Sequence, residues 1–502
     1  MSDEPLLLVL DAGTSSVRAL LYAAGGAVLA TEQREITQYY PQPGWVEHDP
    51  AEIWERTLAC ARDVVAKAGD VDRIAAIGIT NQRETAVAWD KLSGQPLARA
   101  IVWQDRRTAD ACAALREAGH EPAVSAATGL VLDPYFSATK WRWMIDHVPE
   151  VAAAGTSLAL GTVESWLVWK LSGGAHVSDA SNASRTLLLP LEGPGFDAGL
   201  SDLFGVPHAS LPRVVDMAGP VATCDPAWLG AAIPICGLAG DQQAATIGQG
   251  CREVGATKAT FGTGAFVLTA TGSKPRRSHH RLLATVLSQI GGKRTYALEG
   301  SVFVAGSMVK WLRDGLGWIG HARETEALAR ANDNGGVTVV PALAGLGAPH
   351  WRPDAKGAIF GLTLGTRREH IVRAALESIA HQCSDLQRAF AADGAPWVTL
   401  RIDGGMTQNS WLAQDLADML GLTVERPADV ESTARGAAML AAVGVGLYST
   451  IEGAEAMLPT IECFNSSAPA TAVTARLAAW HDALERTLRQ SAGWMPIPPD
   501  PS

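Results

Sequence analysis

Two short turns rich in glycine and threonine are the segments of this sequence best suited to bind phosphate. Residues 11–16 (Asp-Ala-Gly-Thr-Ser-Ser) and 262–264 (Gly-Thr-Gly) each lie between two apolar runs. Phosphate oxygens need several N–H and O–H donors that converge on one point, and a glycine-threonine turn combines close approach of the backbone with a hydroxyl. Two such turns can hold a triphosphate from opposite sides, which indicates chemistry on a phosphoryl group.

Further residues extend this candidate nucleotide site. Asp11 ends the first apolar run and is a candidate acceptor for Mg²⁺ or its waters, because Mg²⁺ keeps several waters and takes few protein carboxylates. A third glycine turn, residues 401–409, follows a predicted strand and precedes a predicted helix, and close backbone approach there suits adenine or its ribose. Any one of these turns alone fits an ordinary hairpin or strand–helix turn. Three of them in this order favour a nucleotide site.

The turns need strands on either side, and the flanking apolar runs predict them. Residues 6–22 and 257–269 each predict a strand, a glycine turn and a second strand. The same unit appears twice about half a chain apart, which indicates two related domains, residues 1–250 and 251–502. The rest of the chain alternates strands and helices, as is typical of layered α/β folds. We predict strands at 74–80, 86–89, 337–341, 398–402 and 423–425, and helices at 50–68, 106–117, 307–313, 369–391, 410–420 and 433–443.

Composition excludes several other classes of protein. With 502 residues the chain is about three times a typical domain of ~150 residues. Its 41 Lys and Arg against 52 Asp and Glu give a net charge of −11 without a basic block, which argues against nucleic acid and anionic lipid as partners. No apolar stretch approaches the ~20 residues of a membrane span, so we expect no membrane insertion and a cytoplasmic location. The seven cysteines include no Cys-x-x-Cys pair, so we expect reduced, mostly buried thiols.

The common nucleotide-binding motifs do not account for this site. No Gly-x-x-x-x-Gly-Lys-Ser/Thr motif occurs. The one Gly-x-Gly-x-x-Gly, residues 315–320, follows the predicted helix at 307–313 rather than a strand. We interpret it as the end of that helix and a loop.

Five sequence blocks resemble the FGGY carbohydrate kinases, which belong to the actin, Hsp70 and hexokinase ATPase superfamily. The resemblance runs from Leu7 to Tyr448 and is densest in residues 78–85, 100–108, 128–137, 239–244 and 345–349. The segments Asn-Gln-Arg-Glu-Thr and Asp-Pro-Tyr-Phe-Ser in these blocks distinguish the members that phosphorylate glycerol from those that act on pentuloses. The resemblance therefore implies an α/β fold of two ribonuclease H-like domains that flank a cleft.

The resemblance also implies a reaction and its site. The reaction is ATP-dependent phosphorylation of glycerol at the 3-hydroxyl, giving sn-glycerol 3-phosphate and ADP, with Mg²⁺ and in a homo-oligomer, either a dimer or a tetramer. The residues that match the polyol pocket of the family are Arg83, Glu84, Trp103, Tyr135, Asp241, Gln242 and Phe266. Those that match its nucleotide site are Thr14, Ser15, Ser16, Arg18, Gly262, Thr263, Gly306, Gly405 and Asn409, with Lys310 near the adenosine where these kinases often have glutamine.

The chemistry of the pocket residues agrees with this assignment. A triol both donates and accepts hydrogen bonds, so Arg83, which only donates, and Glu84, which only accepts, can together fix one end of it. Trp103 and Phe266 can cover its C–H faces. Asp241 then lies at the reacting hydroxyl, as general base or as the acceptor that orients the hydroxyl.

Two alternatives are open. Another kinase of the same family, with erythritol, a pentulose or dihydroxyacetone as its acceptor, would use every pocket residue named above. A non-catalytic protein with the ATPase fold would be a chaperone-like nucleotide switch or a sugar-responsive repressor. The first would need a separate peptide-binding module and the second a basic helix-turn-helix, and the sequence indicates neither.

Overall fold

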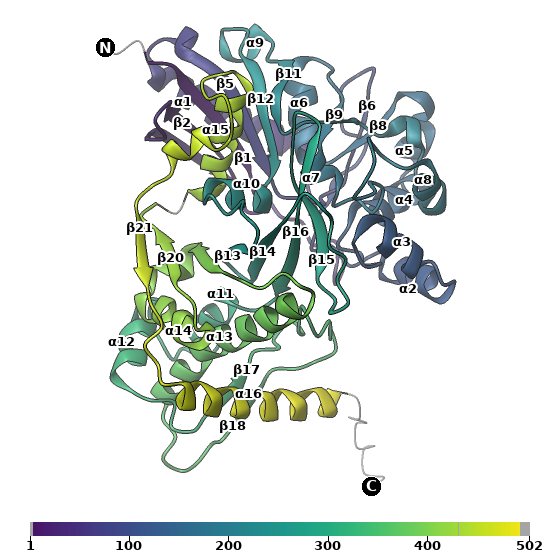
Figure 1. Cartoon of the computed structure of the whole chain (residues 1–502). Coiled ribbons are helices and arrows are strands. Elements are labelled where there is room, and N and C mark those ends of the chain that lie inside the picture. The colour runs from purple at the N-terminus through teal and green to yellow at the C-terminus, as the bar shows by residue number, and fades with distance from the viewer. Residues whose placement is uncertain (1–3, 430, 492–502) are drawn as a thin grey trace.

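The computed structural model describes residues 4–429 and 431–491 and contains two lobes, each built on one large sheet (Figure 1). The sheet of the first lobe has the strand order β11-β12-β5-β1-β2-β3, and that of the second lobe has the order β15-β16-β14-β13-β19-β20-β21. The strands of the first sheet are Ala218–Thr223, Pro234–Gly240, Ile74–Asn81, Leu6–Ala12, Ser16–Ala23 and Val28–Glu35 in that order, and those of the second are Leu283–Ile290, Lys293–Val302, Ala265–Gly272, Ala256–Phe261, Thr399–Asp403, Val424–Pro427 and Ile461–Phe464.

Each sheet contains a hairpin that carries one of the predicted glycine turns. β1 pairs antiparallel with β2, with Asp11 opposite Arg18, and β13 pairs antiparallel with β14, with Phe261 opposite Ala265. The first strand of each hairpin also pairs parallel with a later strand, β1 with β5 and β13 with β19. Both hairpins predicted from the sequence are confirmed, and the two lobes share the same arrangement of hairpin and parallel strand.

Helices cover both faces of the first sheet. α1 (Pro50–Ala68) and α6 (Val163–Ser172) pack on one face, and α10 (Asp241–Gly248) and α15 (Ser432–Gly444) pack on the other. α15 comes late in the chain, yet it lies along α10 and on β12, β5 and β1, as its position in Figure 1 shows. The second half of the chain therefore completes the core of the first lobe.

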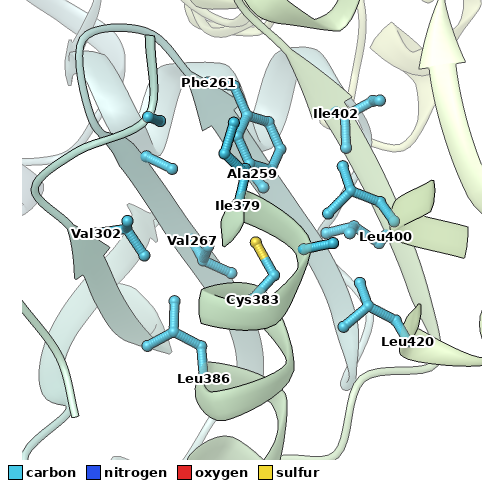
Figure 2. Close-up of a cluster of buried hydrophobic side chains, with 14 of the residues drawn as sticks. Ala259, Phe261, Val267, Val302, Ile379, Cys383, Leu386, Leu400, Ile402 and Leu420 are labelled. Carbon is cyan, nitrogen blue, oxygen red and sulfur yellow. The ribbon is translucent and has the colours of Figure 1, made fainter. Parts of the chain in front are cut away.

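The core of the second lobe lies between its sheet and the long helix α13 (Arg368–Ala392). Figure 2 shows Ile379, Cys383 and Leu386 of α13 beside Val267 and Leu400 of the sheet. These three helix residues follow one another at intervals of four and three, which places them on one face of the helix. The predicted helix at 369–391 is therefore confirmed, and so is its packing on a sheet.

Two other predicted helices differ from the structure at their ends. The helix predicted at 106–117 is α2 (Ala109–Glu117), because the Asp105 carboxylate accepts hydrogen bonds from the main-chain N–H groups of Arg107 and Val46 at 2.8 and 2.7 Å and holds this stretch in a turn. The helix predicted at 307–313 is α11 (Gly306–Lys310) followed by a π-helical turn, Trp311–Gly315. Gly317 then has a φ of 64°, so residues 315–320 end a helix, as interpreted from the sequence.

None of the helices in the described ranges has the length and apolarity needed to cross a membrane. All seven cysteines are free and six of them are buried, which confirms the expectation from their spacing. The other helices and strands are β4 (Glu47–His48), β6 (Val87–Asp90), β7 (Ala100–Ile101), α3 (Glu121–Thr128), α4 (Ser137–His147), α5 (Pro149–Ala153), β8 (Leu158–Gly161), β9 (Val177–Asp179), α7 (Ala180–Ala183), α8 (Ala198–Phe204), β10 (Arg213–Val215), α9 (Pro226–Leu229), α12 (Glu324–Ala331), β17 (Thr338–Val340), β18 (Ala358–Phe360), α14 (Ser410–Leu420) and α16 (Ala470–Ser491).

Candidate active site

The first glycine turn joins β1 to β2. Ser15 is exposed, whereas the hydroxyls of Thr14 and Ser16 each accept a hydrogen bond at 2.9 Å, from Nε1 of Trp103 and from the amide of Gln33. A hydroxyl that accepts a hydrogen bond keeps its own proton to donate. The turn therefore offers two oriented hydroxyl donors, and the indole of Trp103 connects it to the predicted polyol pocket.

Asp11 and Arg18 form an ion pair directly behind this turn. Asp11 is buried at the end of β1, and the Arg18 guanidinium donates to its Oδ2, with Nε at 3.2 Å. Arg18 also donates to the carboxylate of Glu431, the residue before α15, at 2.6 Å. Among the residues that the structure describes, none donates to Oδ1 of Asp11. One oxygen of this carboxylate is therefore available to a ligand.

The second and third glycine turns lie against each other at the end of β13. The N–H of Gly306, at the start of α11, donates to the carbonyl oxygen of Gly262 at 2.9 Å, and a Cβ at Gly306 would lie only 2.4 Å from that oxygen. Gly404 has a φ of 92°, and a Cβ there would lie 2.4 Å from the carbonyl oxygen of Phe261. Only glycine fits these positions. Gly405 beside them is exposed, with open space where a side chain would be.

Three other predicted nucleotide-binding residues lie around these turns. Thr263 is exposed in the second turn, and Lys310 is exposed at the last residue of α11. Asn409 caps α14, since its Oδ1 accepts from the N–H of Leu412 at 3.0 Å and its Nδ2 donates to Thr325 at 3.3 Å. The side chain of Asn409 thus already has protein partners on both sides of its amide.

Four buried charged side chains from both lobes form a closed ring. Glu299, in β16 of the second lobe, accepts from Arg83 at 2.7 and 3.1 Å and from Arg185 at 3.0 Å. Arg185 donates to Glu84 at 2.6 Å, and Nε of Arg83 lies 3.9 Å from Glu84. The side chains are at most 2% exposed, so each charge depends on the others for compensation. Burial alone would raise the pKa of Glu299, but Arg185 and Arg83 lower it to about 2.

The backbone at Glu84 adopts a conformation that is rare for residues other than glycine. Its φ is 60°, and the N–H of Thr85 donates to the carbonyl of Arg83 at 2.7 Å, which makes Glu84 the centre of a γ-turn. The carbonyl of Glu84 accepts from Oγ of Ser137 at 3.0 Å and from Nζ of Lys140 at 3.2 Å. Ser137 and Lys140, both in α4, thus hold the strained turn in place. Burial lowers the pKa of the Lys140 ammonium group to about 7.

Asp241 is the first residue of α10, directly after β12, and lies beside Arg83. Its Oδ1 is 3.2 Å from Nε of Arg83 and accepts a hydrogen bond from the N–H of Gln242 at 2.7 Å. Its side chain is 31% exposed, against 2% for Arg83 and Glu84, so Asp241 is the most exposed carboxylate of this group. Burial raises the pKa of Asp241 to about 6. The positive charge of Arg83 lowers this pKa, whereas the negative charge of Glu84 raises it further.

Three aromatic rings stand next to these charges. The ring of Trp103 lies 5.7 Å from that of Tyr135 and 6.0 Å from that of Phe266, both in edge-on contact. Phe266 belongs to β14 of the second lobe, whereas the other two belong to the first. The rings are partly exposed and so form a wall that can cover the C–H groups of a ligand.

Comparison with known proteins identifies the fold. The model of the N-terminal domain of the FGGY family of carbohydrate kinases matches residues 6–248, and that of the C-terminal domain matches residues 257–445. The chain belongs to the FGGY family of carbohydrate kinases. The two matched regions contain all of the turn and pocket residues described above.

Several relatives of this FGGY kinase carry the name glycerol kinase. The protein of that name from Alkalilimnicola ehrlichii is 52% identical over 495 residues, covering 97% of this chain and 98% of the relative. That from Ectopseudomonas mendocina is 51% identical, covering 96% and 98%. Among solved structures, the Plasmodium falciparum glycerol kinase with ADP is 33% identical with a TM-score of 0.90, covering 97% of this chain and 98% of that one. The shared architecture is the two-domain fold of the actin and hexokinase type, as predicted.

The structure of this FGGY kinase brings the predicted pocket residues together in one place. Charged, amide and aromatic side chains from both lobes meet there, and the predicted turn residues lie around the three glycine turns. Four other buried charged residues of the same site were not predicted from the sequence: Lys140, Arg185, Lys258 and Glu299. Lys258 and Glu299 are each the single charge in an uncharged stretch, 254–268 and 295–309, which is a signal that could have found them. Lys140 and Arg185 carry no such signal, since Arg142 stands two residues after Lys140 and Arg185 follows the polar run Ser-Asn-Ala-Ser.

Proposed function

We propose that this FGGY kinase transfers the γ-phosphoryl group of ATP to the 3-hydroxyl of glycerol, giving sn-glycerol 3-phosphate and ADP. Relatives named glycerol kinase are about half identical to it over nearly the whole chain, which supports glycerol as acceptor. The Plasmodium falciparum glycerol kinase with ADP, similar over 97% of this chain, supports an adenine nucleotide as donor.

The observation that carries the proposal is the position of Asp241. It is the partly exposed carboxylate next to a buried cation, and its raised pKa leaves it ionised at neutral pH yet basic enough to accept a proton. In the proposed step the O–H bond of the 3-hydroxyl breaks and its proton passes to Asp241. The hydroxyl oxygen forms a bond to the γ-phosphorus, and the bond from that phosphorus to the bridging oxygen of ADP breaks.

The remaining pocket residues orient the acceptor. Arg83 offers only donors and Glu84 only acceptors, so a hydroxyl that accepts from one and donates to the other is fixed in direction. Trp103, Tyr135 and Phe266 cover the C–H faces, which keeps water from the reacting oxygen. Orientation of this kind supplies roughly 7–11 kcal/mol of the barrier in favourable cases.

The three glycine turns are proposed to hold the nucleotide. The turn at Thr14 and the turn at Thr263 would grip the phosphates, while Gly405, with open space above it, would lie against the adenosine. Asp11 fits Mg²⁺, because its Oδ1 has no donor among the described residues, and Mg²⁺ takes one or two carboxylates and completes its shell with waters and phosphate oxygens. When bound, the ion would neutralise charge on the phosphates.

The test of this proposal is an Asp241→Asn enzyme assayed with glycerol and ATP. We expect glycerol binding to persist and turnover to fall at least ~10²-fold, because the amide cannot accept the proton. Asp225→Asn is the matched control, since Asp225 caps α9 through the N–H of Ala227 at 2.9 Å and an asparagine keeps that cap. Turnover close to that of the wild type in Asp241→Asn would remove Asp241 from the chemistry.

A panel of acceptors tests the choice of substrate. Initial rates with glycerol, erythritol, a pentulose and dihydroxyacetone at fixed ATP should give the highest kcat/KM for glycerol. Dihydroxyacetone has a carbonyl in place of the 2-hydroxyl, and a site built to pair hydroxyls rejects an analogue that lacks one by up to ~10⁴–10⁵-fold. Erythritol and a pentulose are longer than glycerol, and a pocket shaped for three carbons should bind them less well. A higher kcat/KM for any of the other three would assign the enzyme to that acceptor instead.

A further inference from the structure

Lys258 is a buried lysine next to the acceptor pocket that the proposed reaction does not use. It lies in β13, the strand that leads into the second glycine turn, and it is fully buried. Its Nζ donates a hydrogen bond to Oε1 of Gln242, from α10 of the other lobe. In the part of the chain that the structure describes, no carboxylate is in ion-pair contact with Lys258.

Burying an ammonium group without a paired carboxylate lowers the stability of the fold, so a lysine in such a place points to a role other than stability. Burial lowers the pKa of Lys258, and the negative charges of Asp403, Asp241 and Glu299 oppose this effect. The positive charge of Arg83 lowers the pKa of Lys258 further, in the same direction as burial. The ammonium group thus lies among charges of both signs, and Gln242 is its one direct side-chain partner in the ranges that the structure describes.

The contact determines how the amide of Gln242 is oriented. An ammonium group only donates hydrogen bonds, so the oxygen of the amide must face Lys258 and its nitrogen must point the other way. The main chain of Gln242 is also held, because its N–H donates to Asp241 at 2.7 Å and its carbonyl accepts from Thr246 at 2.7 Å. No described residue accepts a hydrogen bond from Nε2 of Gln242.

We propose that Lys258 is a positioning residue for acceptor selection: it fixes Gln242 with its N–H donors toward the pocket. A substrate oxygen at this position must accept a hydrogen bond from Gln242. It binds best if it also carries a proton that it can donate to a nearby carboxylate. A hydroxyl meets both conditions, whereas a carbonyl or an ammonium group meets only one. This inference rests on the proposed function, since it assumes that the pocket beside Asp241 binds the acceptor.

The arrangement also ties the acceptor to the nucleotide side of the molecule. Lys258 is four residues before Gly262, and its strand pairs with β14, which carries Phe266 of the aromatic wall. Gln242 belongs to the first lobe and follows Asp241 directly. The contact between Lys258 and Gln242 therefore forms across the two lobes at the point where donor and acceptor substrates are proposed to meet.

The experiment is a double-mutant cycle with Lys258→Met and Gln242→Ala, read as KM and kcat for glycerol and for ATP. Lys258→Met keeps the length and apolar stem of the side chain but loses the donor. In Lys258→Met we expect the KM for glycerol to rise about 10- to 100-fold, because a hydrogen bond from a charged donor is lost. The KM for ATP should stay within about twofold of the wild-type value. In the Gln242→Ala background the same change should have little further effect on the KM for glycerol, because the two residues act through one contact.

Two further variants make the outcome decisive. Gln242→Glu places a carboxylate against Lys258, so the fold is expected to be retained, but it has no N–H donor and should raise the KM for glycerol at least ~10-fold. Lys170→Met is the control, since Lys170 is a partly buried cation that stacks on Trp54 and Trp166 in the first lobe. Additive effects of the two changes, or wild-type KM for glycerol in Gln242→Glu, would overturn the inference. Failure of the wild-type enzyme to phosphorylate glycerol would instead overturn the proposed function.

Discussion

The surroundings of Asp241 show how burial and neighbouring charges together set the pKa of a single carboxylate. Burial and the nearby Glu84 raise its pKa, whereas Arg83 at 3.2 Å lowers it, and the balance leaves the pKa at about 6. A carboxylate with an unshifted pKa would be a weaker base, and one with a much higher pKa would be protonated at neutral pH. The arginine is prevented from pairing fully with Asp241 because both of its terminal nitrogens donate to Glu299.

The raised pKa predicts the pH dependence of the reaction. With MgATP saturating at each pH, kcat/KM for glycerol should be level near neutral pH and fall below about pH 6, toward tenfold per pH unit, as Asp241 becomes protonated. Initial-rate measurements from pH 5 to pH 8 check this. A profile that stays level down to pH 5 would contradict it.

At the same scale, the sequence predicted the residues that we propose to bind the acceptor but not the buried charges that hold them. Arg83, Glu84 and Asp241 stand in blocks whose residue types indicate their chemistry. Glu299 and Lys258 have only uncharged residues next to them in their strands, and their partners are more than a dozen residues away in the chain. No local pattern predicts which side chain a buried charge will meet, because that depends on how the two lobes pack.

Helix α15 packs closely against its neighbours in the first lobe. It lies along α10 and across the first sheet, and small residues allow its backbone to approach both. At Gly436 a Cβ would lie 1.8 Å from the carbonyl oxygen of Ala244 in α10, and at Gly78 in β5 a Cβ would lie 2.5 Å from the carbonyl oxygen of Ala437. The position of α10, and with it that of Asp241 at its first residue, depends on this contact.

Gly436→Ala is therefore predicted to destabilise the protein. Alanine favours a helix by about 1 kcal/mol relative to glycine, but forcing a methyl group into a filled contact costs about 1–3 kcal/mol. Because main-chain atoms must move here, we expect the upper end of that cost and a fall in Tm of about 2 °C. Differential scanning calorimetry checks this against Gly25→Ala, where nothing lies within 4 Å of the added Cβ. Equal Tm values for the two variants would show that α15 can move away from α10.

The elements were largely predictable, and their differences from prediction have physical causes. The two hairpins and helix α13 follow from apolar periodicity and glycine turns, which are local. The placement of α15 on the first lobe was not predictable in this way, because an alanine- and glycine-rich helix fits any closely packed surface. The late start of α2 depends on the side chain of Asp105, which bonds to Val46 from a distant part of the chain.

Across the whole molecule, the ring of Arg83, Glu84, Arg185 and Glu299 joins the two lobes at the acceptor pocket. Three of its members belong to the first lobe, and only Glu299 belongs to the second. The pocket is therefore complete only when the lobes are in the arrangement seen here. Any movement that separates β16 from Arg83 would leave two buried arginines without one of their carboxylates.

Glu299→Gln is predicted to damage both stability and glycerol use. Breaking a buried ion pair on one side costs about 3–5 kcal/mol, and misplacement of Arg83 and Glu84 should lower kcat/KM for glycerol at least ~10²-fold, with a smaller effect on the KM for ATP. Calorimetry and initial rates measure the two effects. Glu377→Gln is the control, since Glu377 is a buried partner of Arg373 at 2.9 Å in the second lobe. A variant that loses stability like the control but binds glycerol normally would show that the ring is only structural.

The hydrogen bond from Trp103 to Thr14 has a consequence for how the two substrates influence each other. Its indole N–H donates to a threonine hydroxyl whose own proton remains available for a phosphate oxygen. The indole, the hydroxyl and the phosphate oxygen can therefore form one continuous chain of hydrogen bonds. A nucleotide that completes the chain restrains Trp103, and an acceptor that packs on Trp103 restrains the threonine. Bound nucleotide should thus increase the affinity for the acceptor, and bound acceptor should increase the affinity for the nucleotide by the same factor.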